Sequence, residues 1–422
     1  MHDFVYKDEK LYCEELSIDT ISREVGTPFY LYSLNTLRRH YHVFDKAFEE
    51  IPHLICFSTK ANSNIAILKV FVDEGSGLDI VSGGELFRAL KTGIDPKKVV
   101  FAGVGKTKEE IKYALETGVL LFNTESTQEL IAINEVAKEL NKKADVALRI
   151  NPDIDPKTHP YISTGLKKNK FGMDIDYALE DCRLAKTLKH LDIVGIHIHI
   201  GSQIVETSPF VDALKRIEEF IKKLREENFS IKYFDLGGGL GITYDSESPP
   251  HPGEFAKAII PTLKRLNCTI ILEPGRVIAG NAGILVTKVL YIKTTKDKNF
   301  IIVDAAMNDL IRPSLYNSYQ NILPVDKPDS DHSKIIADVV GPICESGDFL
   351  AKERVLPELK QGSLLAVMSS GAYGFPMSSN YNSRPRVPEV LADGKDYYII
   401  RKRETYQDLI RGEEIPQFLK KD

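Results

Sequence analysis

Short apolar runs that end in polar or glycine-rich turns recur along the chain between residues 52 and 273. Runs of this length and pattern are typical of β-strands. Eight can be read in order, at His53–Lys60, Leu78–Gly84, Val99–Gly105, Val119–Ser126, Asp145–Pro152, Asp192–Ser202, Ile231–Gly239 and Thr269–Arg276.

The segments between these runs carry apolar residues at the spacing of an amphipathic helix. The clearest cases are Ile65, Leu68 and Val72; Ile111, Ala114 and Leu115; and Leu214, Ile217, Ile221 and Leu224. Strand and helix that alternate through eight strands predict a parallel sheet, and eight strands close into a (β/α)8 barrel. An open Rossmann sheet is the alternative. The sequence has no G-x-G-x-x-G after the first strand, and polar residues follow one strand after another rather than a single switch point, so the pattern favours the barrel.

After residue 282 the pattern changes to long alternating apolar runs without intervening helices, as in Ile284–Thr295 and Lys334–Gly341. This indicates a β-rich domain. We therefore predict an α/β protein with a barrel over residues 25–280 and a β-rich, Greek-key-like domain over residues 281–422. Residues 1–24, which begin with a hairpin pattern at Phe4–Cys13, are assigned to that second domain. Two stretches, 151–173 and 326–333, read as loops, and the first is either a lid or a solvated connection.

Composition narrows the class of protein. The 422 residues are 43% hydrophobic and 27% charged, with a net charge of −5, as in globular proteins. No basic stripe is present, which argues against nucleic acid and membrane as partners and favours a small-molecule substrate. Charges interrupt the first 16 residues and no apolar run spans a bilayer, so we expect a cytoplasmic protein. The five cysteines lack any C-x-x-C pair, so neither a zinc site nor a disulfide framework is predicted, and we expect no metal.

Reactive groups of a barrel lie at the carboxyl ends of its strands. The first strand ends at Lys60, whose amine, if desolvated, becomes the nucleophile that a Schiff base requires. The alternative is an ordinary surface lysine. On the sixth strand His197 and His199 alternate with apolar neighbours and are expected to point into the barrel, with His199 nearer the mouth. There it is placed to stack on a planar cofactor, whereas His197 reads as a core residue. Metal binding by the pair is the alternative, but no third ligand is evident.

The last two strands end in further polar groups. Asp235-Leu-Gly-Gly-Gly suits close approach of backbone N–H groups to a phosphate, although a tight turn also needs glycine. Glu273-Pro-Gly-Arg276 places an acid and a guanidinium at the mouth, where a structural ion pair is the alternative. Together the strand ends supply an amine, a flat ring, a phosphate cradle and an acid, which are the parts of a pyridoxal phosphate site.

At this point the chain resembles the alanine-racemase-like barrel group of pyridoxal-phosphate-dependent decarboxylases, the class II family that includes ornithine, lysine and arginine decarboxylases. The resemblance spans nearly the whole chain. Seven motifs carry it in family order: Phe57-STKAN, His197-IHIGSQ, Asp235-LGGGLG, Glu273-PGR, Arg312-PSLY, Cys344-ESGD and Gly371-AYG.

The resemblance implies roles for individual residues. Lys60 would link covalently to pyridoxal 5'-phosphate, His199 stack on its ring, and Glu273 hold the proton on its nitrogen. The other cofactor-binding residues implied are Ser202, Gly238, Gly239, Gly275, Arg276 and Tyr373. The family further implies a homodimer with shared active sites, in which Cys344 and Glu345 reach the partner subunit's barrel.

Cys344 is implied as the proton donor, although a lone cysteine also reads as a small buried hydrophobe. The substrate contacts implied are Arg276, Arg312, Tyr316, Glu345 and Tyr373. An acid at the ring nitrogen makes the cofactor a strong electron sink, which favours decarboxylation over racemisation.

Arginines and a tyrosine beside an acid suit a substrate with a distal carboxylate as well as a distal amine. With these residues, the resemblance implies the conversion of meso-2,6-diaminopimelate to L-lysine and CO2, the last step of lysine biosynthesis, as the expected reaction. Arg312 is the expected specificity residue, and a surface arginine at a turn is its alternative. The same scaffold also serves ornithine, lysine and carboxynorspermidine decarboxylation. A catalytically inactive binding protein of the same fold is the remaining alternative, and intact Lys60, Glu273 and Cys344 argue against it.

Overall fold

The computed structural model describes residues 2–155, 158, 170–328 and 333–420. The chain forms two compact units. The barrel unit is residues 36–281, and the β unit combines residues 1–35 with residues 282–422.

The barrel unit is built on eight parallel strands of the described chain, in which each strand pairs with the next and the last pairs with the first. They are β5 (His53–Ser58), β6 (Gly77–Ile80), β7 (Val99–Phe101), β8 (Leu121–Thr124), β9 (Ala144–Asn151), β11 (Leu191–His197), β12 (Tyr233–Asp235) and β13 (Thr269–Leu272). The predicted (β/α)8 barrel is confirmed. A short strand, β10 (Met173–Asp174), adds to β9 outside the closed ring.

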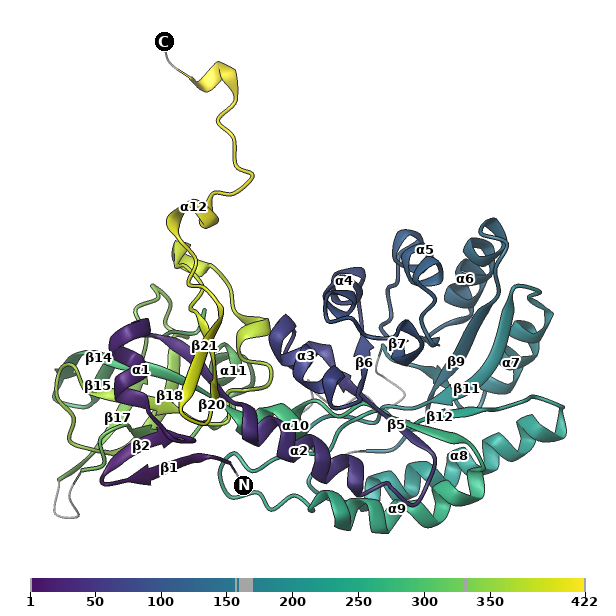
Figure 1. The fold of residues 1–422 in the computed structure, drawn as a ribbon, viewed down its shortest axis with the longest axis horizontal. Coiled ribbons are helices and arrows are strands. Elements are labelled where there is room, and N and C mark those ends of the chain that lie inside the picture. Colours follow the sequence, from purple (N-terminus) through teal and green to yellow (C-terminus); the bar gives the residue numbers. More distant parts are fainter. Residues whose placement is uncertain (1, 156–157, 159–169, 329–332, 421–422) are drawn as a thin grey trace. The chain divides into compact units, whose positions relative to one another are not determined.

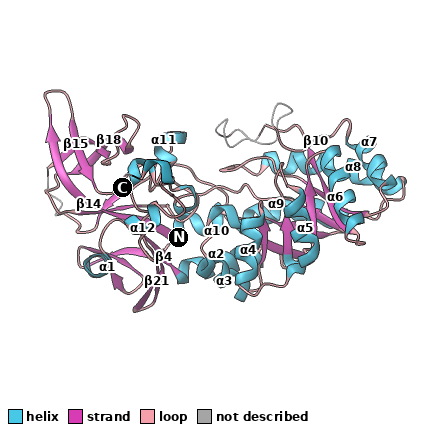
Figure 2. Ribbon diagram, turned by 90° about the horizontal axis from the view of Figure 1, so that it is seen from above, coloured by secondary structure: helices cyan, strands magenta, loops and turns pink. Residues whose placement is uncertain are grey.

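Helices surround these strands (Figures 1 and 2). They are α2 (Leu34–Lys46), α3 (Ile65–Asp73), α4 (Gly83–Lys91), α5 (Lys108–Thr117), α6 (Thr127–Glu139), α7 (Ala178–Thr187), α8 (Ser208–Glu226), α9 (Pro252–Leu266) and α10 (Arg276–Ala279). Side-chain N-caps fix where several begin. Asn64, Ser82, Thr107 and Ser126 each accept a hydrogen bond from a backbone N–H of the first turn, which satisfies groups that a helix start leaves unpaired.

The predicted helix faces are confirmed for α5 and α8, but the face predicted for α3 is partly wrong. Of the predicted α3 residues Ile65, Leu68 and Val72, only Leu68 is buried, together with Ile67 and Phe71, and Ile65 is 39% exposed. The α3 sequence IAILKVFVD is apolar on almost every side, so its periodicity does not identify the buried face.

Apolar side chains fill the barrel below its mouth. Cys56, Val100, Leu121, Ala147, Val194 and Ile271 form one buried cluster, contributed by six of the barrel strands. Because side chains alternate along a regular strand, the residue two positions beyond Leu121 also points inward, one layer nearer the mouth. On β8, the side chain of Asn123 is therefore expected to point into the barrel.

The β unit contains a mixed sheet in the order β18-β17-β15-β14-β4-β20-β21, with β19 paired to β14 and β16 to β19. These strands are β4 (Phe29–Ser33), β14 (Gly283–Thr294), β15 (Asn299–Val303), β16 (Ile322–Pro324), β17 (Lys334–Val340), β18 (Phe349–Pro357), β19 (Leu364–Val367), β20 (Glu389–Asp393) and β21 (Asp396–Arg401). Its helices are α1 (Ile18–Val25), α11 (Arg312–Tyr316) and α12 (Tyr406–Leu409). The β-rich second domain is thereby confirmed.

The N-terminal hairpin forms a sheet of its own rather than extending the large one. Strands β1 (Phe4–Lys7), β2 (Lys10–Cys13) and β3 (Leu16–Ser17) pair in that order among the described residues. Phe4, Leu11 and Cys13 pack into one apolar core with Ile284 and Val286 of β14. This core ties the start of the chain to its C-terminal part.

The boundaries of the two units differ from the predicted ones. We placed residues 25–35 in the barrel, but β4 lies between β14 and β20 in the sheet of the β unit. Its residues are all buried, and a strand buried on both faces has no alternation that would mark its neighbours. The possible lid at 151–173 falls mostly on residues 156–157 and 159–169, which are outside the described residues. Among the described helices, none combines the length and apolarity needed to cross a membrane.

Candidate active site

Lys60 lies at the mouth of the barrel, in a 3₁₀ turn (Thr59–Ala61) directly after β5. Its Nζ is 2.9 Å from Oδ2 of Asp79, and Ser58 Oγ donates to the same oxygen at 2.6 Å. Asp79 is fully buried. Burial and the charge of Glu273 raise the pKa of Asp79, against the opposing effect of Lys60. Lys60 is therefore held in place by a buried carboxyl group on the neighbouring strand, unlike a mobile surface lysine.

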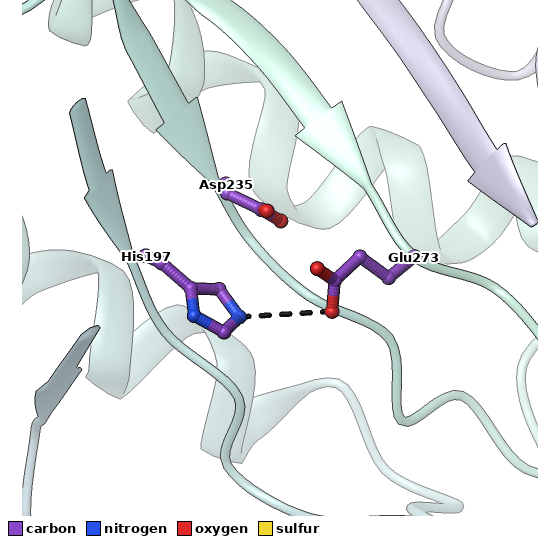
Figure 3. Close-up of side chains that lie close together, drawn as sticks. All are labelled: His197, Asp235 and Glu273. Carbon is purple, nitrogen blue, oxygen red and sulfur yellow. Dashed lines mark ion pairs between the residues drawn. The ribbon is translucent and has the colours of Figure 1, made fainter. Parts of the chain in front are cut away.

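Glu273, directly after β13, lies among three other buried polar side chains. Its Oε2 is 3.6 Å from Nε2 of His197, and its Oε1 accepts a hydrogen bond from Asn123 Nδ2 at 3.2 Å. Asn123 Nδ2 also donates to Asp235 Oδ2 at 2.8 Å. Figure 3 shows the side chains of His197, Asp235 and Glu273 converging from separate segments. One ligand atom from each lies within 4.8 Å of the others.

The pKa values of the two carboxyl groups of this cluster are shifted in opposite directions. Burial, and then the charge of Glu273, raise the pKa of Asp235 well above its ordinary value. Burial acts on Glu273 in the same direction, but His197, followed by Lys60, outweighs it, so the pKa of Glu273 is lowered. The surroundings therefore favour the charged form of Glu273 and disfavour that of Asp235.

The geometry of the two histidines departs from our prediction. Strand β11 ends at His197, so His199 lies in the segment that follows and not on the strand ladder. Its Nδ1 accepts a hydrogen bond from the backbone N–H of Gly238 at 3.1 Å. Burial, followed by the charges of Lys60 and Arg149, lowers the pKa of His199 well below its usual value, so the ring is neutral.

The surroundings of His197 also differ from those that we predicted. We interpreted it as a core residue and saw no third ligand for a metal shared by the two histidines. The structure instead groups His197 with Asp235 and Glu273, and His199 is not part of that group. His197 is buried, as predicted, but it faces an ionised carboxylate.

The glycines after β12 form a cradle that a side chain would fill. A Cβ on Gly238 would lie 2.3 Å from the carbonyl oxygen of Glu273. Gly237 and Gly239 have φ of +71° and +117°, a region that favours glycine. The backbone here lies close to its neighbours, and the N–H groups of Gly237 and Gly238 donate to Asp235 Oδ1 and His199 Nδ1.

Arg276, the first residue of α10, is a further charged residue of the predicted phosphate-binding set. Its guanidinium donates to the Tyr244 hydroxyl at 2.6 Å and to Ser202 Oγ at 3.0 Å, and the residue is 5% exposed. Gly275 is the N-cap of the same short helix. Ser202, Gly238, Gly239, Gly275 and Arg276, predicted as phosphate-binding residues, all belong to the barrel unit.

The remaining predicted residues belong to the β unit. Arg312 begins α11, is buried, and lies over the Tyr316 ring with its Cζ 5.5 Å from the ring centroid. Cys344 is exposed, as its turn-like surroundings predicted, and its N–H donates to Asn382 Oδ1 at 2.8 Å. Glu345 is exposed, and Tyr373 has a φ of +57°, which is unusual for a residue other than glycine.

The sequence argument missed Asp79, Asn123 and Tyr244, and it did not assign a role to the Asp235 side chain. Three of these had a signal. Asp79, Asn123 and Asp235 are polar residues inside apolar strand runs, at positions that alternation directs inward. Tyr244 lies in a segment without strand or helix pattern, and nothing in the sequence pointed to it.

These groups fit pyridoxal 5'-phosphate. Lys60 supplies an amine, neutral His199 a flat ring, Glu273 a carboxylate, and the glycines with Arg276 and Ser202 a cradle for an anion. The family model described as "Pyridoxal-dependent decarboxylase, pyridoxal binding domain" matches residues 34–280. Fold and site thus define a pyridoxal-phosphate-dependent decarboxylase of the barrel class.

Individual relatives narrow this class. The diaminopimelate decarboxylase of Haemophilus influenzae is 52% identical, over 97% of this chain and 98% of the relative. That of Vibrio cholerae is also 52% identical, over 96% of each chain. The crystal structure of the Helicobacter pylori enzyme complexed with L-lysine has a TM-score of 0.89 at 44% identity, covering 93% of this chain and 98% of that one. The chain belongs to the diaminopimelate decarboxylase family, and its cofactor is pyridoxal 5'-phosphate.

Proposed function

We propose that the protein decarboxylates meso-2,6-diaminopimelate to L-lysine and CO2, the last step of lysine biosynthesis. The observation that carries the proposal is the ionised Glu273 in the barrel mouth that also holds Lys60, within a chain 52% identical to diaminopimelate decarboxylases over nearly its whole length.

The residues that would hold the cofactor are Lys60, His199, Ser202, Gly238, Gly239, Glu273, Gly275, Arg276 and Tyr373. When bound, pyridoxal phosphate accepts the electron pair that loss of CO2 leaves on the substrate Cα. Glu273 holds a proton at the ring nitrogen, because an ionised carboxylate stabilises the protonated form. Neutral His199 would pack against the ring and would add no competing positive charge.

The substrate contacts proposed are Arg276, Arg312, Tyr316, Glu345 and Tyr373. The carboxylate that is not removed pairs with Arg312, whose fork of N–H donors matches a carboxylate. Glu345 receives the amine beside that carboxylate. Cys344 delivers the proton to Cα after CO2 leaves, and its exposure in the β unit leaves its thiol accessible for this role.

We also propose a cytoplasmic homodimer with shared active sites, in which Cys344 and Glu345 of one subunit serve the barrel of the other. Large apolar side chains of the C-terminal segment support an interface between copies: Tyr406, Ile410, Ile415, Phe418 and Leu419 are 52% to 84% exposed. All five cysteines are free thiols, which suits a reducing compartment.

Release of CO2 from candidate amino acids tests the reaction. We expect meso-2,6-diaminopimelate to give stoichiometric CO2 and L-lysine, and L-ornithine and L-lysine to give little. If ornithine is decarboxylated and diaminopimelate is not, the proposed substrate is wrong, although the protein is still a decarboxylase. If the protein binds the cofactor but releases CO2 from no diamino acid, carboxynorspermidine included, the proposal that it is a decarboxylase is wrong.

A further inference from the structure

The side chain of Cys344 is exposed, but the backbone that carries it is fixed on both sides. Cys344 is the central residue of a three-residue turn, which the Glu345 N–H closes by donating to the Ile343 oxygen at 2.8 Å. The buried Asp348 carboxylate accepts the Ile343 N–H at 2.8 Å and the Met307 N–H at 2.7 Å. The turn is therefore bound to the segment that precedes α11.

One backbone group of this turn points out of it, toward Asn382. The Cys344 N–H donates to Asn382 Oδ1 at 2.8 Å. Asn382 has a φ of +56° and Ser383 has a φ of +53°, so two successive residues other than glycine adopt the left-handed region. Such outliers persist where the surrounding structure holds them, and they cluster at functional sites. Here the outlier brings a side-chain oxygen to the peptide group of the proposed proton donor.

The loop that carries Asn382 is anchored to the same segment as the turn. The Ser379 N–H donates to the Asn308 oxygen at 2.8 Å, and Asn308 Nδ2 donates back to the Ser379 oxygen at 3.3 Å. Asn308 directly follows Met307, to which the turn is bound, and both precede Arg312 of α11. One short segment thus anchors the proposed proton donor, its asparagine partner and the proposed substrate arginine.

The contact between Asn382 and Cys344 adds little to stability, because it is exposed and water can replace either partner. Its effect is on position. A general acid must lie within hydrogen-bond reach of the atom that it protonates, and a small displacement lowers the rate of proton transfer. A hydrogen bond to the backbone of the acid itself is therefore placed to affect the reaction more than the fold.

We propose that Asn382 is a positioning residue for proton delivery, which holds the Cys344 N–H and thereby fixes the position of the thiol. The inference rests on the proposed function, in which Cys344 protonates the substrate Cα. Loss of CO2 leaves an electron pair that is shared between Cα and the cofactor carbon C4′. When the thiol proton bonds to Cα, a thiolate remains, which solvent reprotonates. When a solvent proton bonds to C4′ instead, one water then cleaves the C=N bond and releases an aldehyde and pyridoxamine phosphate.

Three variants isolate the contact. Asn382→Gly removes the oxygen acceptor and tolerates the left-handed backbone, whereas Asn382→Asp keeps an acceptor in a residue type that also tolerates it. Ser383→Gly is the matched control, because it introduces glycine at the neighbouring left-handed position and leaves the Asn382 oxygen in place. Cys344→Ala is the reference for loss of the donor.

Hydrogen–deuterium exchange of the cofactor-bound protein tests the contact without turnover. We expect one amide of the peptide that contains Cys344 to exchange about tenfold faster in Asn382→Gly, the factor of one lost hydrogen bond, and at the wild-type rate in Asn382→Asp and Ser383→Gly. Unchanged exchange in Asn382→Gly would overturn the inference.

Turnover of diaminopimelate tests the role. We expect Asn382→Gly to lower kcat about tenfold with little change in KM, and to raise the yield of pyridoxamine phosphate per turnover, because the thiol is displaced. Asn382→Asp and Ser383→Gly should stay close to the wild type. In a Cys344→Ala background Asn382→Gly should lower kcat no further, because Asn382 acts through the thiol.

A further loss of kcat in the Cys344→Ala background, or a normal kcat despite faster exchange, would reject the role of Asn382 alone. The proposed function fails in a different way. If Cys344→Ala keeps wild-type turnover, or if the wild type decarboxylates no diamino acid, the proposed function is wrong and the role of Asn382 is rejected with it.

Discussion

At the scale of single residues, two acids of one cluster have different tasks because their surroundings differ. Burial, followed by the charge of Glu273, raises the pKa of Asp235, and these outweigh the opposing hydrogen bonds that it accepts from the Asn123 amide and the Gly237 N–H. Glu273 faces His197, and the charge of Lys60 also acts on it, so it stays ionised. Separation of the pKa values of neighbouring carboxyl groups is a common way to assign acid and base roles at neutral pH.

A second buried acid predicts how stability depends on pH. Burial raises the pKa of Asp309, in the β unit, to about 7. The folded protein then binds a proton between the unfolded pKa and pH 7 that the unfolded chain has lost, so this group makes the free energy of unfolding fall as pH rises through that window.

Asp309→Asn removes this dependence and keeps an oxygen for the Ala306 N–H, which donates to Asp309 at 3.0 Å. We expect the variant to exceed the wild type by roughly 2 kcal/mol in free energy of unfolding at pH 8 and to match it near pH 4. Denaturant unfolding at both pH values measures this. A constant difference at both would show that Asp309 does not titrate as stated.

Arg312 carries the prediction on specificity. L-Lysine retains the carboxylate that is not removed, whereas cadaverine has none, so Arg312→Ala should weaken competitive inhibition by L-lysine and spare that by cadaverine. The expected loss, also seen as a higher KM for diaminopimelate, is about 2 to 3 kcal/mol, as for a hydrogen bond to a charged group. Arg354→Ala is the matched control, because Arg354 also stacks on a tyrosine of the β unit, with 3.8 Å from its Cζ to the Tyr319 ring centroid. Equal weakening of both inhibitors would refute the assignment.

Residues at strand ends could be predicted from the sequence, and residues that depend on strand register could not. Lys60 and Glu273 each follow an apolar run that identifies the end of a strand. The approach of His197 to Asp235 requires the register between β11 and β12, which places these two residues opposite each other. Register in a parallel barrel is set by closure of the whole ring, and single strands carry no local signal for it.

At the scale of elements, the glycine turn after β12 leads to a prediction about cofactor binding. A Cβ on Gly238 would collide with the backbone of Glu273, so Gly238→Ala must displace either the turn or the acid. We expect at least about tenfold weaker binding of pyridoxal phosphate, because anion sites of this kind depend on backbone N–H position. Equilibrium titration of the apoprotein measures it.

Gly105→Ala is the control for that variant. Gly105 also ends a turn after a barrel strand, but a Cβ there would meet nothing within 4 Å. We expect its cofactor affinity to equal that of the wild type. Equal losses in both variants would mean that the turn after β12 has no special role in the cradle.

The eight strands and their order were predictable because each is a short apolar run with a clear end. Ends and faces were less predictable where the pattern is ambiguous. The apolar run through Ile200 extends beyond the last ladder residue of β11, His197, because the segment after the strand stays buried. The uniformly apolar α3 likewise concealed which side packs inward.

At the scale of the whole molecule, the proposed shared site predicts complementation between inactive variants. Lys60→Ala removes the cofactor amine from one unit of the chain, and Cys344→Ala removes the proton donor from the other. If each active site combines these residues from different subunits, a mixed dimer contains one intact site. Co-refolded or co-expressed variants should then recover roughly a quarter of wild-type turnover, the value for random pairing in a two-fold dimer.

Each variant alone is the control for this experiment, and size-exclusion chromatography with light scattering establishes that dimers form. Recovery no greater than the sum of the separate variants would place Lys60 and Cys344 in the same subunit's site. A monomeric wild type that is fully active would reject the dimer itself.

The position of β4 has a consequence for how the protein is made. Phe29–Ser33 pairs with β14 and β20, so β4 has no strand partner until the ribosome has translated the entire barrel. The barrel is therefore the first unit that a nascent chain can complete, while the apolar Phe29 and Leu31 remain exposed and accessible to chaperones. Because β20 begins only at Glu389, a premature stop shortly before it leaves β4 with an open edge and a polypeptide prone to aggregation.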